Sequence, residues 1–334
     1  MDYKRVLRKT IKRVARLEYP DKPTVGEGMK LLFLRGQIDE RTQKVNRLSE
    51  SDDVWTHLAA AISDNTKILY AGGSRKVNYT DGINEEWIDN FKHWNTSYVP
   101  DVIFARGGFS YYEHVVRRFP SAISVYYGAG TRTFPSHKYY DIILVDDATD
   151  VEKGRNKGFN TYLWNKPAAP CFKPTQCQKV FDVCYVANGQ QAKIKRIRWV
   201  YETIPPDISM LHLGYFTNYK VPENVMRVRA ERSNMANMYS QCKVGIVPYT
   251  SYDSAPRALS EMIACGVAPI IVRDGVRANS QGPMIVASKE DFWDIVRVNL
   301  KTWHLRKMDN IPTVESEAAR IRGLIENCML LRKV

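Results

Sequence analysis

The sequence lacks the usual signals for membrane insertion and secretion. No uninterrupted apolar run reaches the roughly 18 residues that a membrane-spanning helix requires. The first twenty residues, MDYKRVLRKTIKRVARLEYP, are charged throughout and contain no apolar core of the kind that a secretory signal carries. These absences predict a cytoplasmic protein, with attachment to the inner surface of a membrane as an alternative.

The sequence also lacks the spaced ligands of a metal site and several catalytic signatures. Its 6 cysteines fit no zinc spacing, and its 6 histidines form neither an HxH nor an HExxH pair. All the cysteines lie in the second half, where we expect them to be reduced and mostly buried. No P-loop, GxSxG elbow or GxGxxG fingerprint is present. The sequence therefore predicts neither a metal nor a resident cofactor.

Acidic residues are fewer than basic ones, at 36 against 49, so the formal net charge is +13. This excess indicates an anionic partner, which could be nucleotide phosphate, anionic lipid or nucleic acid. Residues 4–16, KRVLRKTIKRVAR, hold seven basic residues and no acid, with apolar residues at steps of three and four. The pattern predicts a basic amphipathic helix. It would bind a polyanionic acceptor such as DNA or an anionic membrane surface, or pack on the domain with a solvated basic face.

Short apolar runs alternate with helical stretches from residue 29 onward. Such alternation over 334 residues, of which 44% are hydrophobic and 25% charged, indicates about two α/β domains with parallel sheets. The predicted strands are 29–36, 67–73, 101–108, 122–130, 140–147, 181–187, 208–215, 224–229, 244–249 and 267–272. Helices are predicted to begin near 192, 233, 256 and 289 in the second half. Three prolines mark 164–176 as a linker, so we predict domains at 1–172 and 173–334 that face a cleft, with packing of the final helix back on the first domain as an alternative for that helix.

Glycine and arginine cluster where the predicted strands of the first half end. Ligands bind beyond the carboxyl ends of parallel strands, and a glycine there lets a ligand approach the backbone. A tight turn is the alternative explanation for each glycine. The predicted ligand-side residues of the first domain are Arg35, Gly36, Gly72, Gly73, Arg106, Gly107, Tyr127, Gly128 and Arg132.

The clearest indication of a ligand site comes from the segment VGIVPYTSYDSAPRALSEMIACGVAPIIV (244–272). It predicts a strand, a loop and a helix that begins near Pro256, with Asp253 or Ser254 as its N-cap. Gly266 is in the position where a glycine commonly ends a helix. The segment thus predicts a helix N-terminus close to the carboxyl end of a strand.

This helix N-terminus has the features of an anion site between two carboxylates. The amides of residues 254–257, the helix dipole and the Arg257 side chain would attract phosphate. Glu261 follows Arg257 by one turn on the same face, and Asp253 precedes Glu261 by eight positions. The arrangement suits a nucleotide-sugar, whose hydroxyl groups lie at both ends of its phosphates. A capped helix with two solvated acids is the alternative.

The segment resembles the donor-site signature of retaining glycosyltransferases with the GT-B fold, especially glycosyltransferase family four. That signature has an acid, seven residues, and then Glu within a helix of the type Leu-Glu-Ala-Met-Ala-x-Gly-x-Pro, which LSEMIACGVAP matches closely around Glu261. Asp253 takes the place of the first acid, and Ser254-Ala255 replaces the usual Gly-Phe. The resemblance implies that Glu261 binds the ribose hydroxyls and that Asp253 binds hydroxyls of the donor sugar.

Weaker similarities extend over residues 29–300. The first strand and loop of the family's donor domain resemble CYVANGQQAK (184–193), in which Lys193 matches the lysine and Asn188 stands where arginine is usual. The resemblance implies that Lys193 neutralises the diphosphate, with Arg257 or Arg196 as substitutes. It also implies that the first domain carries the acceptor side. There Tyr127 replaces a frequent histidine.

The resemblance implies an α/β protein of the GT-B type with two Rossmann-like parallel-sheet domains. Its activity would be the metal-independent, retaining transfer of a hexosyl or pentosyl group from a nucleotide-diphosphate-sugar donor to an acceptor hydroxyl. The acceptor would be a glycan, a lipid-linked saccharide or modified DNA. The implied catalytic residues are Lys193, Asp253 and Arg257, and the donor-binding residues are Asn188, Gly189, Lys193, Arg196, Asp253, Ser254, Ala255, Pro256, Arg257 and Glu261. A non-catalytic nucleic-acid-binding or scaffold protein that retains this fold is the alternative.

Overall fold

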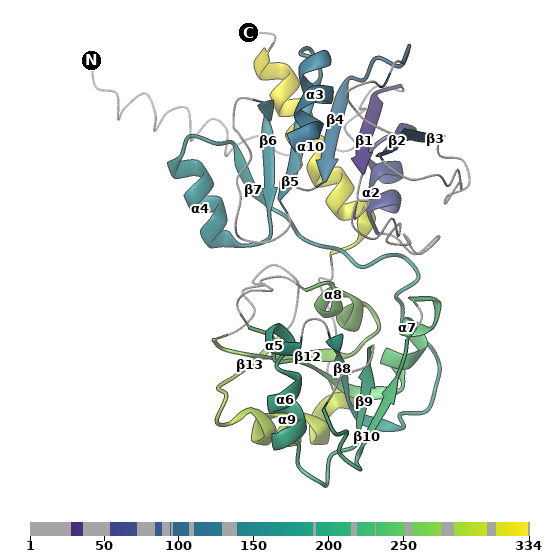
Figure 1. Cartoon of the computed structure of the whole chain (residues 1–334), viewed down its shortest axis with the longest axis vertical. Coiled ribbons are helices and arrows are strands. Elements are labelled where there is room, and N and C mark those ends of the chain that lie inside the picture. The colour runs from purple at the N-terminus through teal and green to yellow at the C-terminus, as the bar shows by residue number, and fades with distance from the viewer. Residues whose placement is uncertain are drawn as a thin grey trace.

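The computed structural model describes two α/β domains (Figure 1). The described residues are 28–35, 54–71, 84–88, 94, 96–106, 110–128, 139–189, 192–214, 219–230, 232–250, 256–274, 284–305 and 312–332. Within these residues no helix is both long and apolar enough to cross a membrane. The predicted fold class, with a parallel sheet in each half, is confirmed.

The first sheet has seven parallel strands among the described residues, in the order β3-β2-β1-β4-β5-β6-β7. Its strands are β1 (Lys30–Arg35), β2 (Asn65–Ala71), β3 (Asn84–Ile88), β4 (Val102–Arg106), β5 (Ile123–Gly128), β6 (Ile142–Val145) and β7 (Thr161–Leu163). The five predicted strands of this half are all present. The edge strands β3 and β7 were not predicted, because an edge strand pairs on one side only and needs no continuous apolar run.

Four helices are described around the first sheet: α2 (Val54–Ile62), α3 (Ser110–Arg118), α4 (Ala148–Asn156) and α10 (Val314–Arg332). The last of them follows the second domain in sequence yet lies against the first (Figure 1). Arg332 donates to Asp141 Oδ1 at 2.6 Å, and the carboxylate of Glu317 accepts from the backbone and side-chain nitrogens of Asn165, both at 3.2 Å. These contacts tie the C-terminal helix to the first domain.

The second sheet has six parallel strands in the described part of the chain, in the order β10-β9-β8-β11-β12-β13. They are β8 (Phe181–Val186), β9 (Met210–Leu213), β10 (Val225–Val228), β11 (Cys242–Val247), β12 (Ala268–Val272) and β13 (Ile285–Ala287). Its helices are α5 (Ala192–Lys195), α6 (Ile197–Thr203), α7 (Arg232–Ser240), α8 (Arg257–Ala264) and α9 (Phe292–Thr302). The five predicted strands are again present, and only the three-residue edge strand β13 was missed.

Both sheets reverse their strand order at one point, between β1 and β4 in the first domain and between β8 and β11 in the second. Loops that leave neighbouring strands at such a point diverge to opposite faces, and ligands bind there beyond the carboxyl ends. The arrowheads of β1 and β4 point toward the second domain, and those of β8 and β9 point toward the first (Figure 1). The carboxyl edges of the two sheets therefore face each other.

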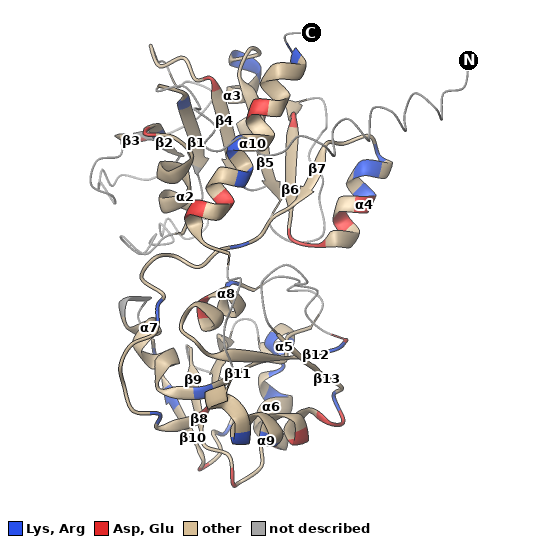
Figure 2. Ribbon diagram, turned by 180° about the vertical axis from the view of Figure 1, so that it is seen from behind, with Lys and Arg blue, Asp and Glu red and all other residues tan. Residues whose placement is uncertain are grey.

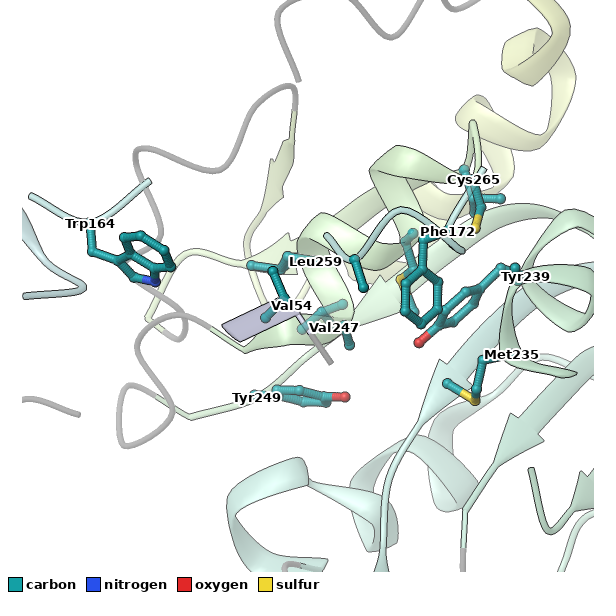
Figure 3. Packing of buried hydrophobic residues seen from close by; sticks show 14 of the residues in the cluster. Val54, Trp164, Phe172, Met235, Tyr239, Val247, Tyr249, Leu259 and Cys265 are labelled. Carbon is teal, nitrogen blue, oxygen red and sulfur yellow. The ribbon is translucent and has the colours of Figure 1, made fainter. Parts of the chain in front are cut away.

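Apolar packing continues from one domain into the other. Buried Val54 and Trp164 of the first half belong to the same cluster as Phe172 of the linker and Tyr239 and Leu259 of the second half (Figure 3). The linker contributes this aromatic contact although it forms no helix or strand between β7 and β8. The packing places the start of α8 next to the carboxyl edge of the first sheet.

Candidate functional site

Helix α8 lies very close to strand β11 because Gly245 has no side chain. A Cβ atom at Gly245 would lie 2.4 Å from the sulfur of Met262, which projects from α8. The helix begins at Arg257 and ends at the C-cap Cys265, and Gly266 follows with φ of +75°, in the left-handed conformation that favours glycine. The predicted role of Gly266 at the C-terminal end of this helix is confirmed.

The prediction that Asp253 or Ser254 caps α8 is wrong. The N-cap is Pro256, in extended backbone conformation with φ of −67° and ψ of 137°, and this residue makes no side-chain hydrogen bond to the helix. A cap must directly precede the first helical residue, and Arg257 already holds that helical position. Because proline has no N–H, the amides available to an anion in the described part of this helix start at Arg257.

Arg257 and Glu261 are one turn apart on α8 but differ in environment. The Arg257 side chain is exposed, whereas Glu261 is only 4% exposed. The hydroxyl of Tyr239, on α7, donates to Glu261 Oε2 at 3.1 Å. Burial and the negative charge of Glu261 together raise the pKa of the Cys265 thiol to about 12. Glu261 is therefore a carboxylate held in a fixed position near the helix N-terminus, rather than a solvated acid.

Lys195, which was not among the predicted site residues, is the buried lysine at the end of helix α5, after β8. Its side chain is 8% exposed, and its Nζ lies 3.6 Å from the ring centroid of Tyr249, just beyond β11. Its backbone carbonyl accepts from the Tyr185 hydroxyl at 2.7 Å. By contrast, Lys193 is exposed. Nothing in the sequence separates these two lysines, because they are two positions apart on a four-residue helix and only packing decides which one turns inward.

Arg196 adopts a left-handed conformation with φ of 58° directly after Lys195. Its guanidinium forms two hydrogen bonds with Asp274, at 3.2 and 3.0 Å. The hydrogen bonds from Arg196 lower the pKa of the Asp274 carboxyl. Arg196 is thus engaged by a carboxylate, and its predicted role as a substitute phosphate ligand stays a prediction. Asn188 and Gly189 follow β8 at the same edge of the sheet.

His212 fixes the backbone where the loop after β8 begins. The ring is fully buried on β9, with Nε2 2.9 Å from the carbonyl oxygen of Ala187 and Nδ1 against the hydroxyl of Tyr201. Since a carbonyl oxygen only accepts, the neutral ring carries its proton on Nε2, and Nδ1 accepts from Tyr201. Gly214 also packs on this carbonyl, since a Cβ there would lie 1.7 Å from the oxygen. These contacts hold the first residue of the loop.

Burial lowers the pKa of His212 below its usual value of 6.5, and the charge of Arg227 lowers it further. The unfolded chain therefore takes up this proton at higher pH than the folded protein. The contribution of neutral His212 to stability is complete above pH 6.5 and is lost as the pH falls from there through the folded pKa.

Over this pH window we expect the contribution of His212 to make the free energy of unfolding fall by up to about 1.4 kcal/mol per pH unit, measured by urea denaturation. The His212→Gln variant keeps an amide donor for Ala187 but does not titrate, so its curve should be flatter. An equally steep curve in that variant would assign the effect to other groups.

In the first domain, Arg106 ends β4, Arg35 ends β1 and Gly128 ends β5, all at the edge that faces the second domain. Tyr127 is only 1% exposed, and its hydroxyl donates to Asp146 Oδ1 at 2.8 Å. Tyr127 therefore supports this edge from within the core. Several predicted site residues lie outside the described residues: Gly36, Gly72, Gly73, Gly107, Arg132, Asp253, Ser254 and Ala255, together with the segment 4–16.

A search for groups of three or more metal-ligating side chains found none among the residues that the structure describes. Metal independence stays a prediction. The described side chains offer a different chemistry. Two cations (Lys195 and Arg257), a helix N-terminus and a buried carboxylate (Glu261) lie around the point where the second sheet reverses its order.

Solved structures of several glycosyltransferases share this arrangement. The lipopolysaccharide outer core galactosyltransferase WaaB in its apo form has a TM-score of 0.60 at 13% identity, over 92% of this chain and 100% of that one. Anabaena HepE in complex with UDP has a TM-score of 0.59 at 11% identity, over 91% and 98%. The catalytic domain of starch synthase IV from Arabidopsis thaliana, bound to ADP and acarbose, has 0.59 at 10%, over 91% and 100%.

The chain therefore has the GT-B glycosyltransferase fold over nearly its whole length. No protein-family profile and no curated protein sequence matches it. At identities of 9 to 13%, these structural neighbours establish the architecture, and the chemistry must be argued from the site itself.

Proposed function

We propose that the protein transfers a sugar from a nucleotide-diphosphate-sugar donor to an acceptor hydroxyl. The observation that carries this proposal is the placement of Glu261, Arg257 and Lys195 around the strand-order reversal of the second sheet. Figure 2 shows basic residues on α5 and at the start of α8, on the side of the first domain. Cations beside a helix N-terminus suit a diphosphate, and a buried carboxylate suits the hydroxyl pair of a ribose.

In this proposal the second domain binds the donor, and catalysis comes from stabilising the leaving diphosphate. Negative charge builds on the diphosphate as the bond to the anomeric carbon breaks, so cations placed there stabilise the transition state more than the bound donor. Lys195 and Arg257 take this role, with Lys193 as an exposed additional cation. Retention of configuration and independence from metal are part of the proposal, and they are supported by the resemblance of residues 253–266 to the retaining donor signature.

A panel of nucleoside diphosphates and their sugars tests the proposal by thermal unfolding. A ligand present at about 100 times its dissociation constant stabilises the folded state by about 2.7 kcal/mol, and the base and sugar that give the largest shift identify the donor. We expect a nucleoside diphosphate to shift the unfolding midpoint more than the corresponding monophosphate does, because the cations lie at the diphosphate position. A panel without any stabilising member would contradict the proposal.

Slow hydrolysis of the donor separates an enzyme from a protein that keeps the fold without turnover. Water can replace the acceptor at a competent site, so a transferase should release the sugar slowly when no acceptor is present. A non-catalytic nucleic-acid-binding protein would bind its polyanion but leave every nucleotide-sugar intact.

The segment 4–16 supplies the prediction for a polyanionic partner. We expect deletion of residues 1–20 to leave folding and donor hydrolysis intact but to weaken binding to DNA or to anionic vesicles. Against duplex DNA, log affinity of the full chain should fall with log salt at about −0.9 per neutralised phosphate. Against vesicles, binding should require anionic lipid and gain about 1 kcal/mol per basic residue at the surface. A truncated protein that binds both as the full chain does would contradict a binding role, and one that fails to fold would make the segment part of the core.

A further inference from the structure

Three buried N–H groups of the first domain have no hydrogen-bond acceptor among the described residues. They are the Nε of Arg106 and the indole Nε1 atoms of Trp55 and Trp164. The two tryptophans are 2% and 1% exposed, so bulk water does not accept hydrogen bonds from their indole N–H groups. Buried donors in native proteins nearly always have a partner, and an unsatisfied one carries the full cost of its desolvation. Three such donors therefore point to a missing acceptor.

The three side chains lie together although they come from distant parts of the chain. The rings of Trp55, on α2, and Trp164, at the start of the linker, are stacked with centroids 5.0 Å apart and an interplanar angle of 15°. The guanidinium carbon of Arg106 lies 4.9 Å from the centroid of the Trp55 ring. We call these three residues the Arg106 cluster. It sits where β4 ends, at the strand-order reversal of the first sheet.

The nearby carboxylate of Asp146 is already used by other donors. Its Oδ1 accepts from the Tyr127 hydroxyl at 2.8 Å, and its Oδ2 lies 3.6 Å from the Nζ of Lys166. The charge of Asp146 is thus shared by Lys166 and Arg106, whose protonated form it favours, but the Nε of Arg106 makes no hydrogen bond to it. What the cluster lacks is an oxygen acceptor, and its guanidinium favours a negatively charged one.

The part of the second domain that faces the Arg106 cluster also carries a positive charge. Arg106 lies at the carboxyl edge of the first sheet, and Arg257 starts α8 on the facing side of the second domain. Burial lowers the pKa of Arg106, and the positive charge of Arg257 lowers it further, whereas Tyr127, Tyr112 and Asp146 offset part of this shift. An anion bound between the two guanidinium groups would turn this repulsion into attraction to both.

We propose that the Arg106 cluster binds an oxyanion, a phosphate or a carboxylate, that is carried by the acceptor substrate. The inference rests on the proposed function, which places the diphosphate of the donor at Lys195 and Arg257. The Arg106 guanidinium supplies a positive charge and paired N–H donors, and the face of the Trp55 ring stabilises that cation. The indole N–H groups of Trp55 and Trp164 supply neutral hydrogen-bond donors. A phosphate of the donor itself is the other source of the same chemistry, and the experiment separates the two.

Inorganic phosphate titrated by calorimetry into the full chain, alone and saturated with the best nucleoside diphosphate, tests the inference. We expect phosphate to bind the chain whose diphosphate position is filled by the nucleotide, and Arg106→Gln to weaken this binding about tenfold or more, the loss of a charge-assisted hydrogen bond pair. The same variant should bind the nucleoside diphosphate within about twofold of the wild-type affinity, since its donor contacts lie on the other domain. The matched control is Arg117→Gln, which removes the same charge from the exposed end of α3 and should change neither affinity.

Each other result overturns the inference in a distinct way. Unchanged phosphate binding in Arg106→Gln would remove the site from Arg106. Loss of nucleoside diphosphate affinity in that variant, with phosphate excluded by the nucleotide in the wild type, would assign the oxyanion to the donor. Equal weakening in Arg117→Gln would reduce the effect to net charge. If no nucleoside diphosphate binds the wild type, the proposed function fails, while phosphate titration of the free protein still reports on Arg106.

Arg106→Lys keeps the test valid if the glutamine variant does not fold. Lysine retains the positive charge but has no planar fork to pair with two oxygens of one phosphate. We expect folded Arg106→Lys, verified by circular dichroism, to bind phosphate several-fold more weakly than the wild type. An unchanged affinity in this variant would contradict recognition by the guanidinium.

Discussion

The Glu261→Gln variant should bind a nucleoside diphosphate about 100-fold more weakly than the wild type and fold normally. The carboxylate is buried, and in our proposal it accepts hydrogen bonds from two ribose hydroxyls; bonds to a charged acceptor contribute about 1.5–3 kcal/mol each. Glutamine keeps the size of the side chain and leaves an oxygen for the Tyr239 hydroxyl, so the packing of α7 on α8 is preserved. Isothermal titration calorimetry measures the affinity, and thermal unfolding without ligand checks the fold.

Tyr239→Phe is the matched control for Glu261. It removes the hydroxyl that donates to Oε2 but leaves the carboxylate in place. We expect this variant to lose some stability and to keep nucleotide affinity within about threefold, because the phenol is not proposed to touch the ligand. Comparable losses of affinity in Tyr239→Phe and Glu261→Gln would mean that the carboxylate only supports the helix, and unchanged affinity in folded Glu261→Gln would remove it from the donor site.

The Lys195→Ala variant should lower the turnover number about 100- to 1000-fold while it raises the dissociation constant of the donor far less. Removing one group that stabilises developing charge in a transition state typically has an effect of this size. The larger effect on turnover follows because the leaving diphosphate gains charge only as the glycosidic bond breaks. The buried position of Lys195, with its Nζ 3.6 Å from the centroid of the Tyr249 ring, holds the cation where water screens it little.

Lys193→Ala removes the same charge two residues earlier and provides the direct comparison. Because Lys193 is exposed, we expect its loss to change turnover by about threefold or less, within the range of a screened surface charge. Steady-state rates of both variants at saturating donor measure the loss of turnover number in each. A larger loss in Lys193→Ala than in Lys195→Ala would return the role to the residue that the sequence resemblance implied. Little change in both would move it to Arg257.

The sequence alone determined the strands that carry the two sheets. Central strands such as β1, β4, β8 and β11 are buried on both faces and therefore read as continuous apolar runs, which local sequence reveals. The proline linker and the role of Gly266 were also readable, because proline and glycine restrict or extend the backbone locally. The strand and the helix of residues 244–272 could be predicted because they are contiguous in the chain, and the role of this segment in donor binding stays a prediction.

Only the tertiary structure decided which side chains meet at the site. Lys195 rather than Lys193 is buried because Tyr249, more than fifty residues away, packs on it. The Arg106 cluster joins the end of one strand to tryptophans from α2 and from the linker, a combination that no local pattern encodes. Close packing of α8 on β11 likewise depends on Gly245 and Met262, which are 17 positions apart in the chain. Local sequence sets backbone preference and burial, whereas contacts between distant segments depend on how the sheets order their strands.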